Sequence, residues 1–297
     1  DLKEANVMHQ NQRISVSKLL VFTVAILFFA ASGCDHDPIY GDNYGRRYTA
    51  SEDFSFDLSV TEYLSLKVIG LNGDIEIIGD PQLTGQCLLS GEKQVESDSR
   101  GDALRELDYL QVKIVREASQ LVIQTDQPES SRGREYTVNY VVRIPVNWTT
   151  EVELLNGNIS ISDMTNAVRA THSNGNITIS NIEHDVVADL TNGNITLENI
   201  NGNVETALVN GNISAEVILS DEEFCKLHVV NGSISLRIPV VTSAELSAGT
   251  TNGTIRLVNL LLENANFGEH SVTGMLNGGA GKIHLQTVNG SIVITGF

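Results

Sequence analysis

Short runs of alternating apolar and polar residues fill residues 155–217, and the same run returns every eighteen residues. Apolar residues two apart lie on one face of an extended strand, and Ile, Val, Leu and Thr, which fill these runs, favour strands. The pattern therefore predicts short strands with one buried face. Two successive repeats place their apolar residues at Ile159, Ile161, Met164, Val168 and Ala170, with His172 last, and at Ile177, Ile179, Ile182, Val186, Ala188 and Leu190.

An Asn-Gly pair begins each repeat. A fixed period near twenty residues is typical of a solenoid, in which like residues lie above like, about 4.8 Å apart. An antiparallel meander is the alternative, because Asn-Gly also favours hairpins, although hairpins do not require the same residue type at each repeat position. We expect the structural turns at Asn156 and Gly157, Asn174 and Gly175, Asn192 and Gly193, Asn210 and Gly211, Asn231 and Gly232, Asn252 and Gly253, and Asn289 and Gly290.

Turn chemistry explains this residue pair. Gly accepts a positive φ freely, and Asn tolerates it best among the other residues. Stacked Asn side chains also form hydrogen-bonded ladders. Asn158, Asn176, Asn194 and Asn212 fit the N-glycosylation sequon, but the turns and the strands already account for these residue types. The sequence leaves open whether each coil has two faces or three.

The segment 54–150 precedes the regular repeats. It contains an early copy of the phrase at residues 71–77, followed by an insertion. Apolar residues spaced three and four apart predict one short helix over residues 97–110, with Ser97 and Ser99 as polar caps. Residues 151–297 form the Asn-Gly repeat solenoid, in which the spacing lengthens to 21 residues from Asn210 to Asn231 and from Asn231 to Asn252.

The first residues carry a targeting pattern. Arg13 and Lys18 precede an apolar run over residues 19–31, which is too short to span a bilayer comfortably and predicts a signal peptide at 1–33. The run ends in Ala31-Ser32-Gly33-Cys34, which resembles a bacterial lipobox, so we expect lipidation at Cys34. Residues 34–53 are predicted to be a flexible tether. The alternative is an ordinary cleaved signal and a secreted protein.

The net charge and the cysteines narrow the possible binding partners and metal sites. The formal net charge is −18 and the chain has no basic run, which argues against nucleic acid as a partner. Cys87 and Cys225 form a disulfide in an oxidising compartment or remain two unpaired core cysteines, and the sequence does not decide between these. No pair of cysteines has metal-site spacing.

The Asn-Gly-(Asn/Asp/Ser)-Ile phrases, the Arg143-Ile144-Pro145 and Arg237-Ile238-Pro239 strand ends and the lipobox-like start resemble a bacterial family of β-strand-repeat proteins. Its members are classed as adhesins of unknown function, and the resemblance covers residues 54–297. It implies an all-β, single-domain, right-handed β-solenoid or β-roll that is secreted or lipid-anchored. The family has no established catalytic residues, so none are carried over.

Catalytic and metal chemistry is not evident. Outward positions of the repeats are mostly Ser, Thr and Asn, whereas Asp163, Asp185 and Asp189 fall at different offsets. The histidines show no metal-ligand spacing, and His172 is expected in the core. We therefore expect no cofactor, no metal and no enzymatic activity.

The leading hypothesis is a membrane-anchored protein of the cell envelope that binds a glycan or protein surface, as an adhesin does. The alternative is a structural or envelope-stress scaffold for a membrane partner, and the third hypothesis is a polysaccharide-active solenoid enzyme.

Overall fold

The computed structural model describes residues 47–60, 64–117 and 119–297. Strands dominate these residues, so the predicted all-β class is confirmed. The predicted signal peptide at 1–33, Cys34 and most of the predicted tether lie outside the described residues. No helix in the described part of the chain is long and apolar enough to cross a membrane.

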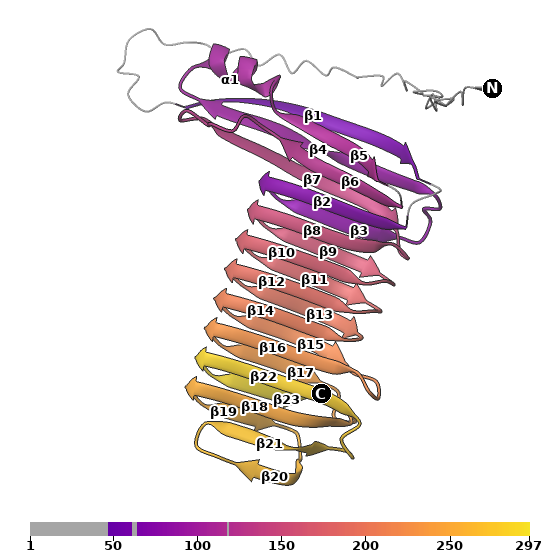
Figure 1. Cartoon of the computed structure of the whole chain (residues 1–297), viewed down its shortest axis with the longest axis vertical. Coiled ribbons are helices and arrows are strands. Elements are labelled where there is room, and N and C mark those ends of the chain that lie inside the picture. Colours follow the sequence, from indigo (N-terminus) through magenta and orange to yellow (C-terminus); the bar gives the residue numbers. More distant parts are fainter. Residues whose placement is uncertain (1–46, 61–63, 118) are drawn as a thin grey trace, which may run out of the picture. The chain divides into compact units, whose positions relative to one another are not determined.

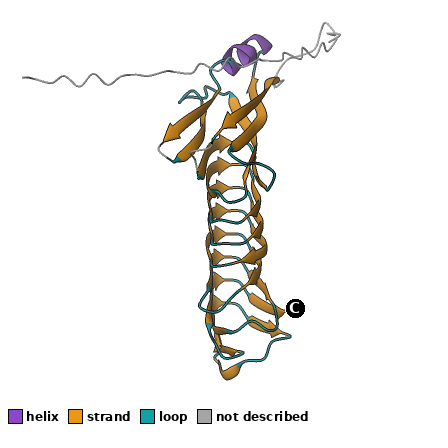
Figure 2. Ribbon diagram, turned by 90° about the vertical axis from the view of Figure 1, so that its right-hand side faces the viewer, coloured by secondary structure: helices purple, strands orange, loops and turns teal. Residues whose placement is uncertain are grey.

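Each regular repeat supplies one strand to each of two facing sheets (Figures 1 and 2). Each coil of the repeat region therefore has two strand-bearing faces. The strand pairs are β8 (Thr149–Asn156) and β9 (Ile159–Met164), β10 (Val168–Asn174) and β11 (Ile177–Ile182), β12 (Val186–Asn192) and β13 (Ile195–Asn201), β14 (Val204–Asn210) and β15 (Ile213–Ile218), and β16 (Phe224–Asn231) and β17 (Ile234–Ile238).

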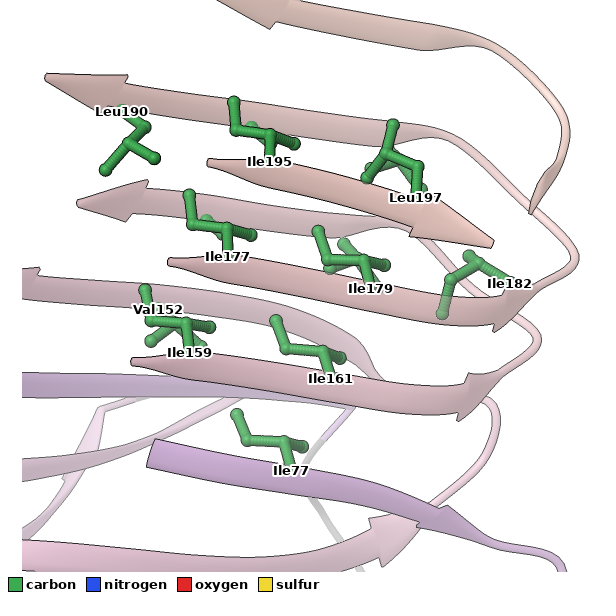
Figure 3. Packing of buried hydrophobic residues seen from close by; sticks show 14 of the residues in the cluster. Ile77, Val152, Ile159, Ile161, Ile177, Ile179, Ile182, Leu190, Ile195 and Leu197 are labelled. Carbon is green, nitrogen blue, oxygen red and sulfur yellow. The ribbon is translucent and has the colours of Figure 1, made fainter. Parts of the chain in front are cut away.

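Successive coils stack in parallel and in register. Ile177 of β11 lies beside Ile159 of β9 on one side and beside Ile195 of β13 on the other. All three side chains point between the sheets, where they are at most 1% exposed (Figure 3). Burying such a side chain stabilises the fold by about 1.5–3 kcal/mol. The β-solenoid is thus confirmed, and the parallel pairing excludes the meander.

The N-terminal part closes one end of the stack. Its elements are β1 (Tyr48–Ser59), β2 (Ser65–Asn72), β3 (Ile75–Asp80), β4 (Gln86–Ser97), α1 (Arg100–Leu107), β5 (Gln111–Glu117), β6 (Gln120–Asp126) and β7 (Glu135–Pro145). Strands β2 and β3 stack directly on β8 and β9, although some 80 residues separate these coils. The insertion between them adds β7 and β4 beyond β3, and β6 and β5 beyond β2. Strand β1, which precedes β2 in the sequence, pairs with β4 at the edge of its sheet.

The structure corrects the predicted boundaries of the tether and of the helix. The tether predicted at 34–53 is too long, because residues 48–53 pair with β4 as part of β1. The helix predicted at 97–110 is too long as well. Ser97 belongs to β4, and Ser99 is the N-cap, whose side chain accepts a hydrogen bond from the Asp102 amide. Asp108 is the C-cap.

The other end contains β18 (Ala244–Asn252), β19 (Ile255–Val258), β20 (Glu263–Phe267), β21 (Ser271–Leu276), β22 (Gly281–Asn289) and β23 (Ile292–Gly296). One sheet has eleven strands in the order β1-β4-β7-β3-β9-β11-β13-β15-β17-β23-β19. The other has twelve, in the order β20-β21-β18-β22-β16-β14-β12-β10-β8-β2-β6-β5. The last strand pair along the sequence therefore lies inside the stack, between two earlier coils (Figure 1).

Candidate binding faces of the solenoid

The Asn residues predicted at the turns lie in one continuous side-chain ladder. The Nδ2 of Asn174 donates to the Oδ1 of Asn156 over 2.9 Å, and the Oδ1 of Asn174 accepts from Asn192 over the same distance. Asn72 of the early copy extends the ladder at one end. Asn210, Asn231, Asn289 and Asn252 continue it in that spatial order. The ladder fixes the register of each coil on its neighbour.

A second ladder runs two residues further along each turn. The Oδ1 of Asn158 accepts both the backbone N–H and the side-chain Nδ2 of Asn176, at 3.2 and 3.1 Å. Asn194 and Asn212 repeat this arrangement. Asp74 begins the ladder, where its Oδ1 accepts from Asn158 and no donor is required of it.

The predicted turn glycines allow the coils to approach closely. Gly175 has φ of +137°, and a Cβ built on it would lie 1.5 Å from the carbonyl oxygen of Gly157. Gly253 and Gly290 are not in the positive-φ region, yet a Cβ on either would lie within 2 Å of a stacked glycine oxygen. Backbone contact between coils, as well as φ, therefore requires glycine at these turns.

A row of hydroxyl groups crosses the outer face of the eleven-stranded sheet. Pairing in register places its members beside one another on five successive strands, one residue per coil. None of their hydroxyls is hydrogen-bonded to another residue in the described part of the chain. We call this set the hydroxyl row: Ser160, Thr178, Thr196, Ser214 and Ser235.

The outer face of the twelve-stranded sheet, which we call the charged face, has charged side chains where the other face has the hydroxyl row, although Arg237 and Glu216 form an ion pair beside the end of that row. It carries ion pairs between neighbouring strands, including Lys67 with Glu153 at 2.6 Å and Arg169 with Asp189 at 3.3 Å. The hydrogen bond from Lys67 to Glu153 raises the pKa of that lysine. A shallow hollow on this face is lined by Arg169, Asp189, Glu205, Ala207, Lys226 and His228. The sequence predicted mostly Ser, Thr and Asn at outward positions, which describes only the eleven-stranded face.

The carboxylates considered for catalysis lie apart. Asp163 accepts a hydrogen bond from Asn181, and Asp185 accepts one from Asn203, so each begins a short ladder at a bend. Asp189 instead faces Arg169 on the charged face. Within residues 47–60, 64–117 and 119–297, no three His, Cys, Asp or Glu side chains are grouped as metal ligands.

His172 lies in the core, as expected, with 3% of its surface exposed. Its Nδ1 lies 2.9 Å from the Leu154 oxygen, and its Nε2 lies 2.8 Å from the Gly157 oxygen. The two ring nitrogens therefore link one coil to the next. Both contacts bind the histidine to backbone, so it does not face a ligand.

Cys87 and Cys225 are free and buried, so the structure selects unpaired core cysteines from the two alternatives. Burial raises the pKa of each thiol to about 12. The thiols therefore remain protonated at neutral pH, and a protonated thiol is a poor nucleophile. Their chemistry is that of small apolar side chains in the core.

Sequence analysis missed a polar cluster beneath α1. The Asp102 carboxylate accepts Nε and Nη2 of Arg134 at 2.6 and 2.9 Å, and it also accepts the Ser97 hydroxyl at 2.6 Å. The hydrogen bonds from Arg134, reinforced by Ser97, hold the Asp102 pKa well below its usual range. The Tyr136 hydroxyl donates to Glu106 over 2.7 Å. These contacts attach the helix to the sheet, and the apolar spacing of the helix does not indicate them.

One protein-family model matches the region that contains the regular repeats. Residues 148–295 match the family model Toastrack DUF4097. The Toastrack match begins just before β8 and extends into β23, so it includes every regular coil together with the coils at the far end. The comparison with curated proteins gave no match.

Solved structures with some similarity include a "putative cell adhesion protein" from Clostridium sporogenes. It is 11% identical, with a TM-score of 0.40, over 84% of this chain and 100% of the other. A "putative adhesin" from Bacteroides fragilis is 13% identical, with a TM-score of 0.39, over 83% and 97% of the two chains. A "putative lipid binding protein" from Parabacteroides distasonis is 11% identical, with a TM-score of 0.31, over 82% and 95%.

Proposed function

We propose that this protein is a non-enzymatic β-solenoid of the cell envelope that binds a glycan surface through the hydroxyl row. The observation that carries the proposal is the row itself. Five exposed or half-buried hydroxyls recur at the spacing of adjacent strands, about 4.8 Å, without an internal hydrogen-bond partner among the described residues. Hydroxyls both donate and accept, so the row matches the hydroxyl-rich edge of a polysaccharide.

The rigidity of the stack favours this use. The two Asn ladders and the buried aliphatic side chains hold each strand in register, so the row is ordered before any ligand arrives. A pre-ordered surface loses little conformational entropy on binding. Many weak contacts in a line then add up, as in other multivalent binders.

The location that we propose is a bacterial membrane surface, with the protein attached through lipid on Cys34 and displayed on the periplasmic or outer side. Its support is the sequence alone: a basic start, an apolar run over residues 19–31 and small residues before the cysteine. If Cys34 is not lipidated, the same pattern predicts a secreted protein.

A second candidate function is a scaffold for a protein partner. The ion pairs and the shallow hollow on the twelve-stranded face favour it, because charged side chains of both signs suit recognition of a protein surface. The two functions use opposite faces, and this separates them experimentally.

The test compares Thr178→Val together with Thr196→Val against Thr171→Val, a control on the opposite face. Valine keeps the shape and strand preference of threonine but lacks its hydroxyl. Binding to insoluble cell-wall polysaccharide is measured by pull-down with purified protein. We expect about a tenfold or greater loss of affinity in the double variant, from two lost hydrogen bonds, and none in the control.

Unchanged polysaccharide binding by the double variant contradicts the proposal. Loss of polysaccharide binding through changes at Arg169 and Lys226 also contradicts it, because the glycan would then lie on the twelve-stranded face. Binding to a protein partner that these changes abolish, without polysaccharide binding, supports the scaffold function.

A further inference from the structure

The strand pair β22 and β23, which we call the inserted coil, occupies a slot between two coils that precede it in the sequence. Strand β22 pairs with β16 on one side and β18 on the other, and β23 pairs with β17 and β19 (Figure 1). The chain therefore leaves a one-coil gap after β17, builds β18 to β21, and then returns to fill the gap.

The slot is specific for this phrase. Asn289 donates to Asn231 and accepts from Asn252, each over 2.8 Å, so it continues the Asn ladder in both directions. The Thr287 hydroxyl donates to the Gly232 oxygen over 2.8 Å. Ile283, Leu285, Ile292 and Ile294 of the inserted coil are at most 1% exposed. Filling the slot therefore completes the core as well as both sheets.

The two connections next to the slot differ in the distance they cross, and this difference leaves room for one coil. Five residues, 219–223, join β15 to β16 across one coil spacing. Five residues, 239–243, also join β17 to β18, but across two spacings. Asn277 holds the longer crossing in place, because its Nδ2 donates to the oxygens of Val240 and Thr242, both at 2.9 Å.

A short link joins the inserted coil to the preceding hairpin. Residues 277–280 connect β21 to β22, and three of them, Asn277, Gly278 and Gly279, have positive φ. The link thus turns sharply to return the chain into its own slot. Chains that return through a short link are prone to exchange the returning element with another copy.

We propose that the slot is an interaction site for a second copy of this chain, which fills it with its own inserted coil. In the reciprocal dimer, every contact of the inserted coil is retained, and only residues 277–280 change their path. The balance between the closed monomer and the exchanged dimer then depends on protein concentration and on the length of the link. A shorter link favours the dimer, and a longer link favours the monomer.

The experiment uses a disulfide to show whether the inserted coil in a slot belongs to the same chain or to a second copy. It is performed on the full chain carrying Cys34→Ser. Ser247 of β18 and His284 of β22 are paired residues, so Ser247→Cys with His284→Cys joins the inserted coil to the slot. Thr171→Cys with Asp189→Cys is the matched control, because β10 and β12 are neighbours that do not exchange. Each variant is warmed to partial unfolding at high concentration, cooled, oxidised and examined on non-reducing gels.

We expect covalent dimers from the 247/284 pair and only intrachain bonds from the 171/189 pair. Deleting Gly279 raises the dimer fraction about tenfold or more, and adding four Gly or Ser residues to the link lowers it. If the shortened chain does not fold, the test rests on comparing dimer formation by the two cysteine pairs in the chain with the natural link. Intrachain bonding alone from the 247/284 pair with the natural link, or equal dimer formation by both pairs, overturns the proposal.

Discussion

At the residue scale, position within a ladder determines which side chain is suitable. An interior residue such as Asn176 donates Nδ2 to Asn158 and accepts from Asn194, so it needs both a donor and an acceptor. The first residue of a ladder needs only an acceptor. Asp74, Asp163 and Asp185 each begin a ladder, which explains why Asp replaces Asn at these positions.

We predict opposite outcomes for two exchanges of Asp and Asn. Asn176→Asp removes the donor to Asn158 and places a carboxylate oxygen against an amide oxygen, so we expect it to cost about 1 kcal/mol of stability. Asp74→Asn retains the acceptor and should change stability by less than about 0.5 kcal/mol. Urea denaturation of both variants measures the difference. Equal stability of the two variants is incompatible with a directional ladder.

At the element scale, α1 is held by ionic hydrogen bonds as well as by its apolar face. Only Ala103 and Leu107 of the helix are buried, whereas Asp102 and Glu106 both contact Arg134 of the segment leading into β7. An eight-residue helix is marginal on its own, so these contacts account for its position.

We predict that Asp102→Asn lowers stability at neutral pH and that this difference disappears in acid. The folded-state pKa of Asp102 lies below its unfolded value of about 3.9, so its contribution is complete above that value and is lost as pH falls through the folded-state pKa. The gap between wild type and variant should be constant above about pH 5 and should close below about pH 4.

Urea denaturation from pH 2.5 to pH 7 follows this gap, and Asp98→Asn, an exposed neighbour, is the control with a smaller effect. A gap that widens in acid would mean that the Arg134 contact is not what holds the helix.

Much of the fold follows from the sequence because its signals are local. The alternation at Ile177 and Ile179 gives the strands, and the eighteen-residue interval gives the stacking. The position of the inserted coil could not be predicted, because Asn231, Asn252 and Asn289 carry equivalent phrases and fit any order. The bonds between Asp102 and Arg134 join residues 32 apart and leave no periodic signal. The difference between the two outer faces appears only once each coil is known to have two strands.

At the scale of the whole molecule, the coils form one continuous structure with two chemically distinct faces. The core and the ladders are shared from coil to coil, whereas the hydroxyl row and the charged face belong to different sheets. Binding through either face depends on the coils remaining in register, because a shift of one residue would turn every hydroxyl inward.

The most direct test of this account is deletion of one coil. Removing residues 175–192 takes out eighteen residues and joins Asn174 to Gly193, so the two Asn ladders at the turns and the buried rows remain continuous. Removing only 175–191 shifts the register by one. Circular dichroism and urea denaturation should show that the eighteen-residue deletion folds cooperatively with a modestly lower midpoint, whereas the seventeen-residue deletion does not fold. Similar behaviour of the two deletions would contradict stacking in register.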